Sequence, residues 1–107
     1  MQTQTFAINN VAARKNFVET MLASGTPLEP VRLEGTQWTF GVVQFADGWS
    51  VKGSAVCVDP ADYDVEKAKE IIAENAMAEA STHYWRTVGY LAMIGHDEIT
   101  VPWNPIA

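Results

Sequence analysis

The chain has 107 residues, of which 48% are hydrophobic and 19% are charged, and its formal net charge is −6 at pH 7. This composition excludes disorder of the whole chain, and the length suits a single domain over residues 1–107. The negative charge disfavours direct nucleic-acid binding, because phosphates are bound by clustered Lys and Arg. No stretch is long and apolar enough to span a membrane, and Met1 to Thr5 lack the features of a secretion signal.

Residues 11–24 are predicted to form an amphipathic helix. Asn9 or Asn10 can cap its start, and Gly25 can end it. At helical spacing its apolar face consists of Val11, Phe17, Val18, Met21 and Leu22. The two prolines that follow, Pro27 and Pro30, make the next segment an extended connection.

The clearest local pattern is a β-hairpin, because two β-rich runs, residues 37–44 and 50–58, flank Asp47-Gly48. We predict a two-residue type I′ turn that pairs Ala46 with Trp49. This register gathers one mostly apolar face: Trp38, Phe40, Val42, Gln44, Val51, Gly53, Ala55 and Cys57. A three-residue turn would shift the pairing by one residue and mix apolar with polar side chains. The prediction therefore places Trp38 and Cys57 in the core.

A long second helix should follow the hairpin. Asp59-Pro60 ends the second strand, since proline cannot donate to a ladder, and Asp62 or Asp64 can cap a helix from Val65 to about Thr87. Gly89 is expected to end this helical region. Its buried stripe is predicted to be Val65, Ala68, Ile72, Ala76 and Ala80, mostly small residues that allow close packing on a sheet.

The end of the chain, from Glu98 to Trp103, is predicted to be a short strand, and Pro102 makes it edge-like. These elements together indicate an α+β fold. We expect a small antiparallel sheet centred on the β-hairpin, packed against one long helix and a shorter N-terminal helix.

The middle of the chain contains a series of recognisable features. The run DGWSVKGSAVCVDP, from Asp47 to Pro60, precedes Asp62-Tyr63-Asp64, an alanine-rich helix, and Trp85 with Gly89-Tyr90-Leu91. In these features residues 38–91 resemble a family of small proteins from tailed phages and prophages of enterobacteria. The resemblance implies a phage-encoded accessory protein that acts in the cytoplasm of the infected host. It carries over no catalytic residue.

Cys57 is the only cysteine, so a nucleophilic site would have to combine it with His83 or His96. A cysteine nucleophile needs an exposed, electropositive setting to become a thiolate. Cys57 instead falls on the predicted apolar face of the hairpin, with Asp59 two residues later. We expect a core thiol and no enzymatic activity.

Carboxylates near the second helix raise the question of a metal site. Asp59, Asp62, Asp64 and Glu66 lack the glycine and the late glutamate of a calcium-binding EF-hand loop, so helix capping explains them better. Glu79 and His83 lie one helical turn apart, which is more typical of a solvated pair than of zinc ligands. We predict no metal and no cofactor.

The acidic residues are unevenly distributed, because seven of the thirteen fall between Asp59 and Glu79. Such a face is most often simply solvated, but it can also steer the protein onto a basic partner. Tryptophan is enriched among the residues that dominate binding energy at interfaces. We therefore expect the partner-binding residues to be Asp62, Glu66, Glu70, Glu74, Trp49 and Trp103.

The leading hypothesis from the sequence is a small acidic phage protein that binds and inhibits a host protein. The host protein would be a nucleic-acid-binding one or a component of antiviral defence such as a CRISPR effector. One alternative is an accessory protein of phage replication or nucleotide metabolism, and another is a structural homodimer.

Overall fold

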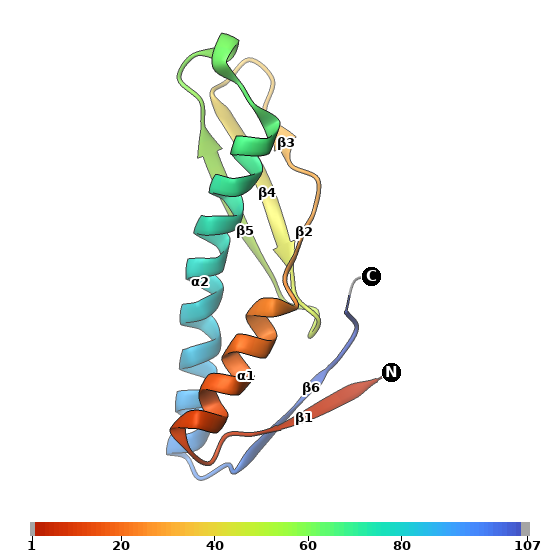
Figure 1. Ribbon diagram of the computed structural model, residues 1–107, viewed down its shortest axis with the longest axis vertical. Coiled ribbons are helices and arrows are strands. Elements are labelled where there is room, and N and C mark those ends of the chain that lie inside the picture. The colour runs from red at the N-terminus through yellow and green to blue at the C-terminus, as the bar shows by residue number, and fades with distance from the viewer. Residues whose placement is uncertain (1, 106–107) are drawn as a thin grey trace.

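The computed structural model describes residues 2–105 and confirms the predicted α+β class, with two helices and two antiparallel sheets. Figure 1 shows α2 running along most of an elongated molecule, with the β4–β5 hairpin beside one half of the helix and α1, β1 and β6 near the other half. Neither described helix is long and apolar enough to cross a membrane. The elements are β1 (Thr3–Ala7), α1 (Val11–Ala23), β2 (Thr26–Pro27), β3 (Val31–Arg32), β4 (Trp38–Gln44), β5 (Ser50–Val56), a 3₁₀ turn (Pro60–Asp62), α2 (Val65–Met93) and β6 (Glu98–Pro102).

The larger sheet is built around β4. One edge of β4 pairs with β5 along its whole length, and the other edge pairs with the two-residue strands β2 and β3. The smaller sheet joins the two ends of the chain, with Thr3 opposite Pro102 and Ala7 opposite Glu98. The C-terminal strand was predicted, whereas β1, its partner, was not.

Helix α1 begins at the predicted cap. The Asn10 side chain accepts a hydrogen bond of 2.8 Å from the Ala13 N–H, as an N-cap residue does. Phe17, Val18 and Met21 are buried as predicted. The prediction that Val11 belongs to the buried face is wrong. Val11 lies in the first turn of α1 and is 68% exposed.

The hairpin turn contains three residues, Ala46–Gly48, so the predicted two-residue turn is wrong. The Phe45 N–H donates to the Trp49 carbonyl at 2.9 Å, and Gln44 pairs with Ser50. Gly48 has φ +90°, as expected where a three-residue hairpin ends in a left-handed position. A type I′ turn would also need a positive φ at Asp47, which the structure does not have.

Asp47 explains why this turn is stable. Its Oδ1 accepts hydrogen bonds of 3.0 Å from both the Trp49 N–H and the Tyr84 hydroxyl, which ties the turn to α2. Burial, together with the Asp47 carboxylate, raises the pKa of the Tyr84 phenol well above its usual value. Tyr84 therefore keeps its proton and remains a hydrogen-bond donor to the turn.

The shift of one residue turns β4 over relative to the prediction, because the side-chain period of a strand is two. Thr39, Val43 and Phe45 are buried, at 2%, 1% and 1% exposure. Trp38 and Phe40, which were predicted to be core residues, are exposed. Strand β5 keeps its predicted orientation, with Val51, Gly53 and Ala55 buried.

Helix α2 packs closely on the hairpin through the predicted stripe of small residues. Asp64 is its N-cap, since its side chain accepts from the Glu66 N–H at 3.0 Å. A Cβ at Gly53 would overlap the Ile72 carbonyl oxygen, so glycine is required for this approach. Ala68, Ile72, Ala76 and Ala80 are buried as predicted, whereas Val65, in the exposed first turn, is 39% exposed.

The end of α2 differs from the prediction. Gly89 lies inside the helix, which continues to Met93. The helix ends where the Gly95 N–H donates to the Ala92 carbonyl and the His96 N–H donates to the Leu91 carbonyl, the pair of bonds of a Schellman motif. The second half of α2 packs with α1 and the terminal strands around the main core, which includes Phe6, Ile8, Phe17, Met21, Phe45, Tyr84 and Val88.

Candidate protein-binding site

The face of the larger sheet that points away from α2 is lined with apolar side chains. Side chains alternate between the faces of a strand, and directly paired residues share a face. Because Val43 and Ala55 face α2, Val42 and Val56 point outward. We call this outward surface the hairpin face, and it consists of Leu28, Val31, Leu33, Trp38, Phe40, Val42 and Val56.

The hairpin face is exposed over its whole extent. The exposed fraction of its residues runs from 36% for Val42 to 68% for Val31. Trp38 and Phe40 stack with ring centroids 5.9 Å apart and planes inclined by 11°. The seven residues together expose on the order of 600 Å², the upper end of what a typical monomer shows as its largest apolar patch. Its size and aromatic content make the hairpin face a candidate interaction site.

Little charge interrupts this surface. Strands β2 to β5 carry two charged residues, Arg32 and Lys52. Arg32 pairs with the buried Thr39, and its guanidinium lies 4.2 Å from the centre of the Tyr63 ring, on the other side of the sheet. Lys52 therefore provides the only charge that these strands present on the hairpin face. A surface poor in charge is favourable for burial at the centre of a protein interface.

The four acidic residues predicted to bind a partner lie along the first half of α2 or just before it, and all are exposed. Glu66 is in an ion pair with Lys69 at 3.5 Å, and Glu29 contacts the same ammonium group at 3.5 Å. The negative charges of these two carboxylates raise the pKa of Lys69, and Glu29 has the larger effect. Glu70 and Glu74, by contrast, form no ion pair within the described residues.

The two tryptophans predicted to be anchors pack against the main core. Trp49 stacks on His83, with ring centroids 3.9 Å apart and planes inclined by 9°. The Trp103 ring lies 6.0 Å from that of Phe6, beside β1. The acids follow the first half of α2, whereas His83 lies in its second half. The structure therefore does not bring the predicted partner-binding residues together in one site.

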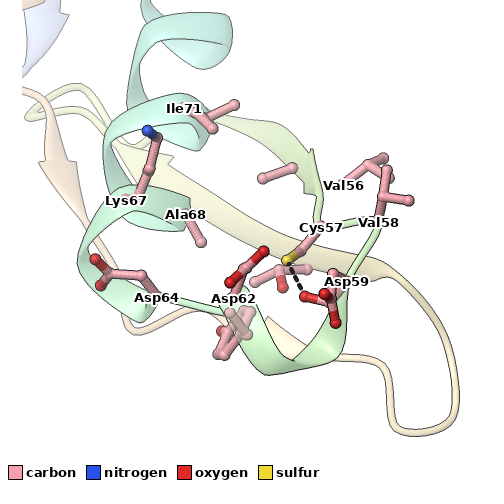
Figure 2. Close-up of a pocket in the computed structure, with 12 residues that line it drawn as sticks. Val56, Cys57, Val58, Asp59, Asp62, Asp64, Lys67, Ala68 and Ile71 are labelled. Atoms are coloured by element: carbon pink, nitrogen blue, oxygen red, sulfur yellow. Dashed lines mark hydrogen bonds between the residues drawn. The ribbon is translucent and has the colours of Figure 1, made fainter.

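Cys57 lines a pocket of about 370 Å³ between the end of β5 and the start of α2 (Figure 2). The predicted core position is wrong, because β5 ends at Val56 and leaves the thiol partly exposed. Its Sγ donates to the Asp59 carbonyl at 3.0 Å, the dashed line in Figure 2. Ala55, Tyr63, Ala68 and Ile71 add apolar lining.

The residues that line this pocket include Asp59, Asp62, Asp64 and Lys67 but no histidine. His83, one of the two histidines that a nucleophilic site would have required, stacks on Trp49 beside the turn, at the opposite end of the hairpin. Two of the carboxylates serve as local caps, since Asp59 accepts from the Ala61 N–H and Asp64 from the Glu66 N–H. The helix-capping role predicted for these acids is thus confirmed for Asp64.

No group of three His, Cys, Asp or Glu side chains within residues 2–105 is arranged to hold a metal ion. The pocket consequently offers carboxylates, an ammonium group and a thiol, and that thiol donates its hydrogen bond to a backbone carbonyl. The hairpin face is therefore the stronger candidate for function.

The sequence-based prediction assigned Trp38, Phe40 and Val42 of the hairpin face to the core and so missed the site. One signal could have revealed it. The run from Trp38 to Phe45 is almost continuously apolar, which is typical of a strand covered on both faces. Helix α2 covers one face, and the second apolar face is left exposed.

A family model described as "Phage protein (N4 Gp49/phage Sf6 gene 66) family" matches residues 5–94 of the chain. The match includes the hairpin, α1 and α2, and so extends well beyond the segment on which the resemblance was based. No curated protein and no solved structure matches the chain.

Proposed function

The chain belongs to this phage protein family, and we propose that it is an accessory protein that binds and inhibits a host protein without catalysing a reaction. The site of action would be the host cytoplasm. The target would be a component of antiviral defence, such as a CRISPR effector, or another nucleic-acid-binding protein.

The observation that carries this proposal is the exposed hairpin face. Its apolar, aromatic character and low charge match the buried centre of protein interfaces. The surface is also broad, whereas a small-molecule ligand is usually enclosed in a concave pocket. Trp38, which stacks on the central Phe40 of this face, is the residue type most often found to dominate binding energy. These features favour a protein partner.

The acids of α2 would have a second role in this proposal. Glu70 and Glu74 are exposed and not neutralised by ion pairs within the described residues. Long-range attraction between such a surface and a basic target raises the rate of association more than the final affinity. The acids would thus steer the encounter, and the hairpin face would provide the lasting contact.

A capture experiment from host lysate tests the proposed function. We expect immobilised wild-type protein to retain one host complex, and Val31→Glu to retain at least about tenfold less, because the new carboxylate would be buried without a partner. Val11→Glu is the matched control, since Val11 and Val31 are both valines with 68% exposure, and only Val31 lies on the hairpin face. Equal capture by both variants, or no specific capture at all, would contradict the proposal.

The steering role of the acids predicts a kinetic effect. We expect the double variant Glu70→Lys/Glu74→Lys to associate with the captured partner roughly three- to tenfold more slowly at low salt. The difference should shrink as salt is raised, because salt screens exposed charges. Interferometry measures both rates. Asp97→Lys/Glu98→Lys, at the other end of α2, makes the same change in net charge and should have little effect; equal slowing by the two variants would rule out local steering.

A further inference from the structure

We infer that the hairpin face of the free protein is covered by the hairpin face of a second copy of this chain, in a symmetric dimer. The inference rests on the proposed function in one respect: the host partner would bind the same residues and would therefore have to displace the second copy.

The molecule has two layers, and one face of its larger sheet is left uncovered. Its shortest extent is 17 Å, which leaves room for α2 and one sheet but for no further layer. The face of β4 that meets α2 includes Val43 and Phe45 and is buried, whereas the opposite face is open to solvent. A second copy placed on that face would give four layers, helix–sheet–sheet–helix, with both sheets covered on both sides. The apolar pattern of β4 on both faces is what such packing requires.

The hairpin face is large enough for a weak dimer. About 600 Å² from each copy gives on the order of 1,200 Å² of buried surface, the lower limit for specific protein interfaces. An interface of this size belongs to the range of weak and transient complexes. A dimer of this strength would exchange readily, as displacement by a host partner requires.

The distribution of charge also favours contact through the hairpin face. Each copy has a net charge of −6, so two copies repel one another unless their acidic surfaces stay apart. Glu66, Glu70 and Glu74 lie on α2, on the opposite side of the molecule from the hairpin face, and would point away from the second copy. A two-fold axis parallel to the strands sets β5 of one copy over β2 and β3 of the other. The two Lys52 side chains would then lie at opposite margins of the interface.

Sedimentation equilibrium of the full chain, from about 1 to about 200 µM, tests this inference. We expect the average mass of the wild type to rise from 11.8 kDa towards twice that value. Val31→Glu should remain a monomer over the whole range, and Val11→Glu should behave like the wild type. Trp38→Ala is the second variant if Val31→Glu does not fold, and it should weaken dimerisation at least about tenfold.

A wild-type mass that stays at 11.8 kDa at every concentration would overturn the inference, as would unchanged association of a folded Val31→Glu or Trp38→Ala. The outcome is separate from that of the capture experiment. Dimerisation through the hairpin face without host capture would support the dimer and remove the proposed host function. Host capture by a protein that is always monomeric would support the proposed host function and remove the dimer.

Discussion

Replacing Gly53 with alanine is expected to lower the free energy of unfolding by roughly 3 kcal/mol, the upper part of the range for overpacked sites. The new methyl group would overlap the Ile72 carbonyl oxygen, which belongs to the backbone of α2 and cannot rotate away. The helix would have to move off the sheet and weaken the contacts of Ala68 and Ile72 with Ala55. For a domain of this size the midpoint of thermal unfolding should fall by about 10–20 °C. Circular dichroism during heating and urea titration measure the change.

Gly89→Ala is the control for this prediction. Gly89 is an exposed residue inside α2, and apart from its chain neighbours and the nearby backbone of its own helix nothing lies within 4 Å of the position that a Cβ would occupy. Alanine is favoured over glycine inside a helix, so we expect a stabilisation of about 0.5–1 kcal/mol. Opposite signs at these two glycines would support the close contact between α2 and β5. A Gly53→Ala variant as stable as the wild type would contradict it.

Much of the fold was predictable because it depends on local signals. Asn10 and Asp64 cap the helices through hydrogen bonds to residues three and two positions later, and the sequence alone indicates such caps. The stripe from Ala68 to Ala80 follows the helical period of its own segment. Elements of this kind need no knowledge of the rest of the chain.

The hairpin register was not predictable by the same reasoning. Asp47-Gly48 fits a two-residue turn and also the last two positions of a three-residue turn. The hydrophobic pattern normally decides between them, but β4 is apolar on both faces and so fits either register. The decision depends on contacts distant in sequence, such as the hydrogen bond from Tyr84 to Asp47.

The terminal sheet illustrates the same limit over a longer distance. Strand β1 has five residues, and its partner β6 is more than 90 residues away in sequence. Its alternating pattern is too short to identify a strand by itself. Gly89 was misread for a related reason, because packing of Val88 and Leu91 against the main core extends α2 beyond a residue that weakens helices.

The candidate site was predicted only in composition. Trp38 and Phe40 were correctly assigned to an apolar face, but that face was oriented towards the core. Orientation cannot be read from a strand whose two faces are similar. The acids of α2 were correctly expected to be exposed, and their role in binding stays a prediction.

Trp38 should contribute most to partner binding. It lies in the row of the hairpin face formed with Leu33 and Val56, is 44% exposed and stacks on Phe40, the middle residue of the face. A tryptophan that becomes buried as an anchor of an interface is typically worth at least about 2 kcal/mol, so we expect Trp38→Ala to weaken binding by roughly 30-fold or more. Since the side chain is only half-buried in the free protein, the variant should remain folded.

Trp85 is the matched control. It is 40% exposed, close to the value for Trp38, but it lies on α2 and away from the hairpin face. Removal of either ring deletes the same atoms from a surface of similar exposure. A difference between the two variants would therefore report the location of the binding site.

The most direct measurement is the affinity of the captured host complex for wild type, Trp38→Ala and Trp85→Ala, determined by titration calorimetry. We expect Trp38→Ala to lose at least about 30-fold and Trp85→Ala to stay within about threefold of the wild type. Equal affinities of Trp38→Ala and wild type, or a larger loss for Trp85→Ala, would show that the partner docks elsewhere.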